Sequence, residues 1–576
     1  MPDVSKRPLA RHGKRAAVAT TCLSVTAALT IGAAPPADAG VLSGVFGLLN
    51  GVVSTVTHIL SPDGIWGYPA ADKAATTSNG AYSAGADPGS LYTIDRAIGS
   101  RSVWMQQDAS RRQLTGQGVG VALLDSGVSL VPGLDGPGKV VYGPDLSIEA
   151  NGPLTDEDTF GHGTHLGGII AAHDPVALTR TTIPALDPAT QLGVAPEATL
   201  EALKLATTDG STDVSQVIAA LDWIAQHPTM PDGTRVRVVN LAFGTDSLQA
   251  YQSDPLAAAA ENAWRHGLVV VVSGGNEGPS AGRLTDPAMD PYVLSVGASD
   301  SNNTVAGWAN PGVASFSSSG TWQRHVDLLA PGRSVASLRD PNSFVDTNHP
   351  EGRVASDTTG RLFRGSGTSQ AAAVVSGAVA LLLQAYPNLT PDQVKYLLTH
   401  SATPVAASPV TAGAGQIDVA AALSDARNMT GTLSLLTSGL TNATQRWTRS
   451  TGQGSLEAAR GGSHLVDANG VALSGEIDVQ GLPWTPATWW PAAASLTAWQ
   501  DGSWNGALWT GAGWASVGGW SSARWSSARW SSARWSSARW SDAAWDSARW
   551  SSARWSSARW SDAQWSSARW SGDRWN

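Results

Sequence analysis

The chain has 576 residues, 42% of them hydrophobic, and a formal net charge of −9 at pH 7. This length exceeds one ordinary domain and this composition supports a packed core, so a wholly disordered chain is excluded. The only cysteine is Cys22, which excludes a disulfide-stabilised scaffold. We therefore expect one large domain with attached segments.

Residues 1–39 have the pattern of a signal peptide. Basic residues come first, an uncharged stretch follows from Ala16 to Pro36, and Ala37-Asp38-Ala39 fits an A-x-A cleavage site. A transmembrane anchor is the alternative, but the apolar part is short and rich in Ala and Thr. This pattern predicts a secreted protein that has lost Cys22.

Residues 40–91 separate this signal from the regularly patterned part of the chain. Residues 41–60 are apolar and carry no formal charge, and residues 61–90 are rich in Gly, Ala, Ser and Pro. Two interpretations stay open. The segment is either a pro-segment, or an interfacial helix followed by a linker.

Residues 92–425 have the pattern of an α/β domain. Apolar runs of strand length alternate with helical stretches, as expected when helices cover both faces of a mostly parallel sheet. We predict strands at residues 119–125, 200–205, 236–241, 268–272 and 292–296. We predict helices at residues 162–172, 213–226, 254–265, 369–385 and 391–401.

Four polar residues stand at strand ends or helix starts, where open α/β sheets place their sites. Asp125 ends the first predicted strand, and Asn276 follows the fourth in S-G-G-N-E-G. His162 lies in G-H-G-T-H, and Ser369 lies in G-T-S. A serine hydroxyl needs a base before it can attack a carbonyl, and the base needs a group that holds its tautomer. Together these residues predict nucleophilic catalysis.

Each motif alone is also typical of a helix cap or a turn, but the order Asp, His, Asn, Ser resembles that of the subtilisin-like serine proteases, the subtilases. The resemblance covers about residues 92–422 and implies a subtilisin-like three-layer sandwich. It implies that Asp125 orients His162 and that His162 takes the proton of Ser369. It also implies that Asn276 and the Ser369 N–H stabilise the oxyanion.

The same resemblance implies where a peptide substrate binds. Residues 240–244 look like the family's edge strand that pairs with an extended peptide, and residues 273–275 look like the facing wall of a pocket. An ordinary buried strand and its turn are the alternative. The family often has a cis proline at the position of Pro287. The substrate-binding candidates are Ala242, Phe243, Gly244, Ser273, Gly274 and Gly275.

This chemistry requires no cofactor. Structural calcium is common in the family, but no contiguous loop has the ligand spacing that would name a site. The run Asp156-Glu157-Asp158 is typical of a solvated loop. His165 lacks the spacing of a zinc-binding helix, so we expect a packed, hydrogen-bonded core histidine and no metal site.

The pattern changes after residue 425. Residues 426–483 contain short alternating pieces separated by Gly and Asn, which predicts a small β subdomain or a linker. In residues 484–576 tryptophan recurs in steps of five or ten, and from Trp520 to Trp575 it stands at every fifth residue, mostly as W-S-S-A-R. This step matches neither a helix face nor a strand face. The segment is either a pentapeptide-period solenoid or a low-complexity tail that adheres to surfaces.

Charge separates this tail from the body. Residues 520–576 carry nine arginines and four aspartates, a net +5, whereas residues 40–519 carry −17. The balance fits a secreted protease that acts on protein or peptide and attaches through its tail to cell-wall glycan or a membrane interface. No nucleic acid is expected as a partner. The alternatives are an esterase with the same triad and a catalytically silent scaffold of a surface adhesion protein.

Overall fold

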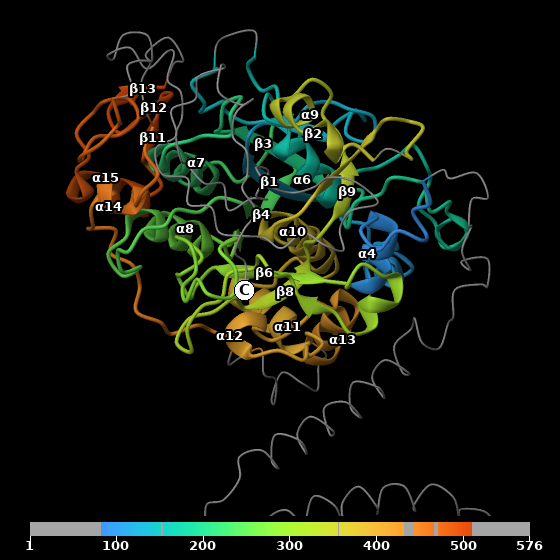
Figure 1. The fold of residues 1–576 in the computed structure, drawn as a ribbon. Coiled ribbons are helices and arrows are strands. Elements are labelled where there is room, and N and C mark those ends of the chain that lie inside the picture. The colour runs from blue at the N-terminus through green and yellow to red at the C-terminus, as the bar shows by residue number, and fades with distance from the viewer. Residues whose placement is uncertain are drawn as a thin grey trace, which may run out of the picture. The chain divides into compact units, whose positions relative to one another are not determined.

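Figure 1 shows the fold of the chain as a computed structural model. The structure describes residues 82–150, 154–354, 356–430, 440, 443–465 and 471–509. The expected signal peptide, most of the 40–91 segment and the repeat from Trp520 to Trp575 lie outside these residues.

An eight-stranded, mostly parallel sheet forms the centre of the domain, in the order β2-β3-β1-β4-β5-β6-β7, with β8 also paired to β6. The β6–β7 pair is antiparallel and the other pairs of this sheet are parallel. Every residue of β1 and of β5 is buried, because a parallel strand covered on both faces needs a continuous apolar run. The strands are β1 (Val119–Asp125), β2 (Val140–Tyr142), β3 (Thr199–Lys204), β4 (Arg235–Leu241), β5 (Val269–Ser273), β6 (Leu294–Asp300), β7 (Gly312–Val313) and β8 (Leu328–Pro331).

Two pairs of helices cover this sheet and complete the predicted three-layer α/β sandwich. Helices α6 (His162–Ala171) and α10 (Thr368–Ala385) pack on each other and against one face. Helices α7 (Val214–Gln226) and α8 (Pro255–Arg265) pack on each other and against the other face (Figure 1). Helix α10 is long and apolar enough to cross a membrane, but 94% of it is buried within the domain, as in a core helix.

Side chains at the helix starts explain where the helices begin. Asp213 forms a capping box at the start of α7, and Thr390 forms one at the start of α11 (Pro391–His400). Asp254 accepts hydrogen bonds from the first turn of α8, which has Pro255 at its first position. These local signals are why the five predicted helices agree with the observed ones to within one residue at each end.

Shorter elements surround the sandwich. Strands β9 (Val335–Leu338) and β10 (Leu362–Gly365) form an antiparallel pair that contacts α6. The other short helices are α4 (Leu91–Ala97), α5 (Ser100–Trp104), η2 (Ile183–Ala185), η3 (Val305–Ala309), α9 (Phe344–Asn348), η4 (Pro350–Gly352), α12 (Pro409–Ala412) and α13 (Val419–Thr430).

Residues 443–509 differ from the sequence expectation, because they pack onto α7 and α8 instead of forming a separate subdomain and a tail that begins at Trp484 (Figure 1). They share one hydrophobic core with the sheet, through Leu456, Trp484, Trp489, Trp499 and Trp504. No strand occurs within described residues 443–465 and 471–483. The elements are α14 (Leu456–Arg460), α15 (Pro486–Ala494), β11 (Trp499–Gln500), β12 (Ser503–Trp504) and β13 (Ala507–Leu508).

A buried ion pair fastens this segment to the sandwich. Arg460 Nε lies 2.7 Å from Asp213 Oδ2, and both side chains are fully buried. Arg460 also donates to the carbonyl oxygens of Gly475 and Ile477. Removing one partner of a buried pair costs about 3–5 kcal/mol, so the start of α7 and helix α14 are held together.

The tryptophans of the segment gather around one carboxylate of α7. Asp222 Oδ2 accepts from the indole Nε1 of Trp489 at 2.8 Å and of Trp504 at 2.9 Å. Trp499 Nε1 donates to the carbonyl oxygen of Ala219 at 2.8 Å. The ring centroids of Trp484 and Trp489 lie 4.9 Å apart, within the range of favourable aromatic pairs. The rings of Trp489, Trp499 and Trp504 therefore enter the core with their N–H groups satisfied, whereas Trp484 Nε1 has no hydrogen-bond partner among the described residues.

The five-residue step from Trp499 to Trp504 has a simple physical basis, because the two residues pair directly across the two-residue turn Asp501-Gly502. The next turn is Asn505-Gly506, and all four turn residues have positive φ, as type I′ hairpin turns require. Two-residue strands that alternate with two-residue turns repeat every four residues, so Trp504 pairs with Ala507 and Trp509 follows the last strand. The turns therefore explain the step from Trp499 to Trp504 alone, and the W-S-S-A-R units contain neither turn dipeptide.

Asp222 makes the stability of this junction depend on pH. Burial raises the pKa of Asp222 to about 7, although the hydrogen bonds from the two indoles lower it. This pKa exceeds the roughly 3.9 of an aspartate in the unfolded chain. The contribution of Asp222 to the free energy of unfolding is therefore complete below pH 4 and is lost as the pH rises through 7. We predict that Asp222→Asn, which keeps an acceptor oxygen, weakens the pH dependence of Tm between about pH 4 and 7. Thermal unfolding followed by near-UV circular dichroism measures this.

The matched control is Asp222→Ala, which removes the acceptor as well as the charge. It leaves two buried indole N–H groups unpaired, at about 1–3 kcal/mol each, and so lowers Tm at every pH. An Asp222→Asn variant with the wild-type pH dependence would contradict the assignment of this titration to Asp222.

Candidate active site

Asp125 and His162 meet in the interior. Asp125 is the last residue of β1, and His162 is the first residue of α6. His162 Nδ1 lies 2.8 Å from Asp125 Oδ1 and 3.0 Å from Oδ2, and both side chains are buried. A buried carboxylate that accepts from Nδ1 fixes the tautomer and leaves Nε2 as the basic nitrogen of the ring.

Asp158 holds the start of α6 in place. Its carboxylate accepts from the N–H groups of Gly161 at 2.7 Å and Thr164 at 2.6 Å. Ser126 Oγ donates to Asp158 Oδ1 at 2.7 Å and accepts from the Gly163 N–H at 3.0 Å. The residues that follow Asp125 and His162 are thus bonded to each other, which supports the direct contact.

The prediction of a solvated acidic loop is therefore wrong for Asp158, whose side chain is 2% exposed. It holds for Glu157, which is exposed. Sequence reasoning missed the role of Asp158, although an aspartate shortly before a helix is a known capping signal. This signal was missed because two further acidic residues precede Asp158, so the three residues were interpreted together as a run of charges.

Thr368 connects Asn276 with the start of α10. The Thr368 N–H and Oγ1 both donate to Asn276 Oδ1, at 2.9 and 3.0 Å. Thr368 Oγ1 in turn accepts from the Gly275 N–H at 3.2 Å. With the amide oxygen held, the direction of the Asn276 Nδ2 donor is set. Sequence reasoning missed Thr368 because a threonine inside G-T-S carries no pattern of its own.

Ser369 is the second residue of α10, directly after Thr368. N–H groups in a first helical turn have no intrahelical acceptor, so the start of α10 presents donors as well as a hydroxyl. Helices α6 and α10 pack on each other, and β1, β4 and β5 run parallel. His162, Asn276 and Ser369 therefore belong to the carboxyl edge of one sheet.

The predicted substrate-binding residues lie on two segments that meet at Thr285. Ala242, Phe243 and Gly244 follow β4, whereas Ser273 ends β5 and is followed by Gly274 and Gly275. A Cβ atom on Gly244 would lie 2.6 Å from Thr285 Oγ1, and one on Gly275 would lie 3.0 Å from Thr285 Cγ2. Close approach of the two segments thus requires glycine. The Asp286–Pro287 peptide bond is cis.

Two details of this prediction are wrong. Asn240 and Leu241 do not lie on a sheet edge, because β4 pairs with β1 on one side and β5 on the other. Their backbone groups are used by those neighbours, so only residues beyond Leu241 can offer main-chain groups to a peptide. The Phe243 side chain is 1% exposed and packs in the core, so it does not form the wall of an open pocket.

His165 is buried close to His162. Burial and the neighbouring His162 lower the pKa of His165 to about 3, against a backbone hydrogen bond with Leu338, so it stays neutral. It is a packed core histidine, as predicted. No group of three or more His, Cys, Asp or Glu among the described residues is arranged to hold a metal ion.

Comparison with known proteins matches residues 116–454 to the subtilase family. The chain belongs to the subtilase family. Serine protease AprX of Bacillus subtilis (strain 168) is 36% identical over 290 residues, which are 50% of this chain and 61% of AprX. Subtilisin Savinase of Lederbergia lenta is 32% identical over 315 residues, 54% of this chain and 94% of Savinase. The match thus spans less than two thirds of AprX.

Among solved structures, a cold-adapted subtilisin-like serine proteinase aligns with a TM-score of 0.40 and 26% identity, covering 56% of this chain and 96% of that one. The relatives above are serine proteases, and residues 116–454 are a serine-type endopeptidase domain. The family match ends at residue 454, so the tryptophan-rich segment from Trp484 lies outside it.

Thr368 should act on catalysis through Asn276. We predict that Thr368→Val, which keeps the β-branched shape and loses the hydroxyl, lowers kcat about tenfold to a hundredfold with little change in KM, since two hydrogen bonds at about 0.5–1.5 kcal/mol each are lost. Steady-state kinetics on a peptide amide measures both constants.

Two variants frame this result. Thr368→Ser keeps the hydroxyl and should restore kcat to within a few-fold of the wild type. Asn276→Ala removes the donor itself and should cost about 10²–10³ in kcat. If the serine variant is as slow as the valine variant, the hydroxyl does not position Asn276.

Proposed function

We propose that the whole protein is a secreted serine endopeptidase that hydrolyses peptide bonds of proteins. One observation carries this proposal: the buried contact of 2.8 Å between His162 Nδ1 and Asp125, at the sheet edge to which Ser369 also belongs. Membership of the subtilase family supports it. In this proposal Asp125 orients His162, and His162 is the general base for Ser369.

The reaction is acyl transfer in two halves. Ser369 Oγ bonds to the scissile carbonyl carbon while His162 takes the hydroxyl proton. The carbonyl oxygen becomes an oxyanion that accepts from Asn276 Nδ2 and the Ser369 N–H, each worth about 3 kcal/mol. The C–N bond then breaks as His162 gives its proton to the leaving amine. Water releases the acyl group by the same steps in reverse.

The peptide substrate would lie between Ala242–Gly244 and Ser273–Gly275. These segments are rich in small residues, so their main-chain groups are the ones that a substrate can reach. Binding by main-chain hydrogen bonds gives affinity with loose sequence selectivity. In this proposal calcium would act as a structural ion, and no residues are assigned to its site.

The proposed location of the protein rests on the sequence patterns of residues 1–39 and of the C-terminal repeat. Residues 1–39 have the signal-peptide pattern, which supports secretion. The repeat after residue 519 carries a net +5 and a tryptophan at every fifth residue, which supports attachment to anionic cell-wall glycan or a membrane interface. We place the enzyme outside the cell, retained at the surface by its tail.

The purified full chain should react with a fluorophosphonate probe and degrade casein, because both need an activated serine hydroxyl. Ser369→Ala should lose the probe label and the proteolysis together, and His162→Ala should lose at least about 10³-fold in kcat. Labelling is read by in-gel fluorescence and proteolysis by peptide release.

The alternatives give different outcomes. Labelling with ester hydrolysis but no casein cleavage would indicate an esterase with the same triad. Neither labelling nor cleavage, after any pro-segment is removed, would indicate a silent scaffold and contradict the proposal. Ser369→Thr serves as a folding control, since it keeps a hydroxyl at the start of α10.

Removing the repeat should release the enzyme from the cell surface. Trp484 to Trp509 belong to the core, so the deletion starts after Trp509 and removes residues 510–576. We predict that the shortened protein keeps its Tm and loses retention on isolated cell walls or anionic vesicles, measured by sedimentation. Retention equal to that of the full chain would contradict the attachment role.

A further inference from the structure

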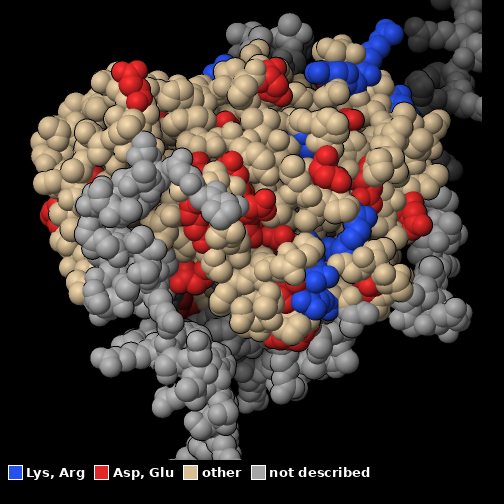
Figure 2. Space-filling model, turned by 90° about the horizontal axis from the view of Figure 1, so that it is seen from above, with Lys and Arg blue, Asp and Glu red and all other residues tan. Residues whose placement is uncertain are grey.

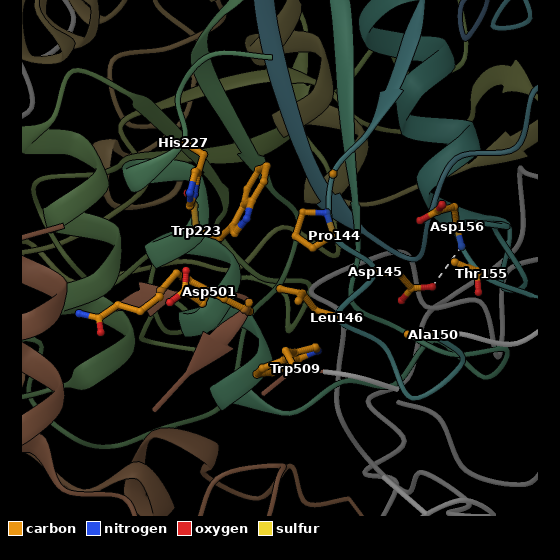
Figure 3. A pocket seen from close by; sticks show the side chains of 14 residues that line it. Pro144, Asp145, Leu146, Ala150, Thr155, Asp156, Trp223, His227, Asp501 and Trp509 are labelled. Atoms are coloured by element: carbon orange, nitrogen blue, oxygen red, sulfur yellow. Dashed lines mark hydrogen bonds between the residues drawn. The ribbon is translucent and has the colours of Figure 1, made fainter. Parts of the chain in front are cut away.

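A pocket lies where residues 499–509 meet the catalytic domain (Figure 3). Its volume is about 390 Å³, within the range of roughly 300–1,000 Å³ that is typical of ligand sites. The loop after β2, the end of α7 and the β11–β13 sheet all contribute to it. The side chains that matter below are Asp145, Asp156, Trp223, His227, Asp501 and Trp509.

One side of the pocket is aromatic. The rings of Trp223 and His227 stack with their centroids 4.9 Å apart. His227 is exposed, and Trp223 and Trp509 are half-buried, so ring surface remains accessible inside the pocket. Such faces bind other rings and guanidinium groups.

The other side of the pocket is acidic. Asp145 and Asp156 lie together across from Trp223 and His227 in Figure 3, and the Asp156 N–H donates to Asp145 Oδ2 at 3.1 Å. Burial, and then the charge of Asp145, raise the pKa of Asp156 to about 6. Asp501, from the β11–β12 turn, also lines the pocket but lies on the side of Trp223 and His227 in Figure 3. Asp145 and Asp156 repel one another, so a cation beside them is favourable.

The described lining residues include neither lysine nor arginine. Lys204 lies nearby, but its Nζ is bonded to Glu149 Oε2 at 2.6 Å and to the carbonyl oxygens of Leu154 and Glu157. Acidic side chains also gather near the middle of the face of the molecule seen in Figure 2. The pocket therefore lacks a cation of its own.

We propose that this pocket binds one W-S-S-A-R unit of the chain's own C-terminal repeat, with an indole against Trp223 and His227 and a guanidinium beside Asp145 and Asp156. The chemistry of the unit matches both sides of the pocket. The charges also match, because residues 520–576 carry a net +5. This proposal does not depend on the proposed catalytic activity.

The chain leads to the pocket. Trp509 lines it, and the first unit begins at Trp520, eleven residues later. Eleven residues span at most about 36–40 Å, which is ample for a return to the pocket. Closing so short a loop gives the tethered unit an effective concentration of about a millimolar, so weak contacts suffice.

The described part of the chain already binds tryptophan in this way. Asp222 accepts from two indole N–H groups, and Asp392 Oδ1 accepts from Trp264 Nε1 at 2.7 Å. Indole N–H groups held by a carboxylate thus recur in the described part of the chain. A docked unit would also cover Asp156, two residues before the Asp158 that caps α6.

Cysteine cross-linking tests the docking in the full chain. Because Cys22 is the only cysteine, Cys22→Ser gives a clean background, and Ser369→Ala keeps the chain intact. Gln500→Cys lines the pocket, and Ser521→Cys lies in the first unit. We expect an intramolecular disulfide that forms at least tenfold faster than with Leu248→Cys, which is 85% exposed and outside the pocket lining.

A charge series identifies the contact. Asp156 and Asp501 have φ values of 64° and 50°, which asparagine also adopts, so Asp156→Asn with Asp501→Asn preserves the backbone and removes the charge. This pair should slow disulfide formation at least fivefold. Asp232→Asn, exposed and outside the pocket lining, should leave the rate unchanged.

Three results would overturn the proposal. Equal rates for positions 500 and 248 would show that the unit does not dock. Disulfide-linked dimers without the intramolecular product would assign the pocket to a second copy of the chain. Competition by soluble peptidoglycan fragments, without competition by a W-S-S-A-R-W-S-S-A-R peptide, would assign the pocket to a glycan.

Discussion

The buried carboxylate of Asp125 is the constraint on which the site depends. It stands at the end of a strand with no exposed residue, so it must find hydrogen-bond donors inside the protein. His162 Nδ1 and the Ser126 N–H supply them. Those partners require α6 to begin at one place, and Asp158 caps the helix there. Satisfying one buried charge thus sets the position and tautomer of the histidine.

The other half of the site depends on neutral hydrogen bonds. Thr368 donates two hydrogen bonds to the Asn276 amide oxygen, and its hydroxyl accepts one from the Gly275 N–H. Because Thr368 and Ser369 are consecutive, the first turn of α10 both carries the Ser369 hydroxyl and holds the Asn276 side chain that follows β5. Gly275 connects the same turn to the end of β5 through its hydrogen bond to Thr368 Oγ1.

Helix α7 links the sandwich to the tryptophan-rich segment. Its capping residue Asp213 pairs with Arg460, and Asp222 in its middle holds two indoles. Both carboxyl groups are buried. The C-terminal segment stabilises them there by supplying their hydrogen-bond donors. The catalytic domain and residues 443–509 therefore share one core, and the repeat begins from a folded base beside the acidic pocket.

The sequence by itself determined five of the eight strands, the four helices of the sandwich and the four motif residues, because periodicity, caps and short motifs are local signals, whereas the short strands β2, β7 and β8 carried too little pattern to be predicted. Only the tertiary structure decided that Asp158 caps α6, that Thr368 bridges to Asn276, that Phe243 is buried, and that Trp484 to Trp509 join the core. The Asp158 cap spans only three to six residues and was hidden by its acidic neighbours, whereas the other three depend on which surfaces meet across tens to hundreds of residues. Such contacts leave no periodic pattern in the segment that makes them, since burial is decided by the partner surface.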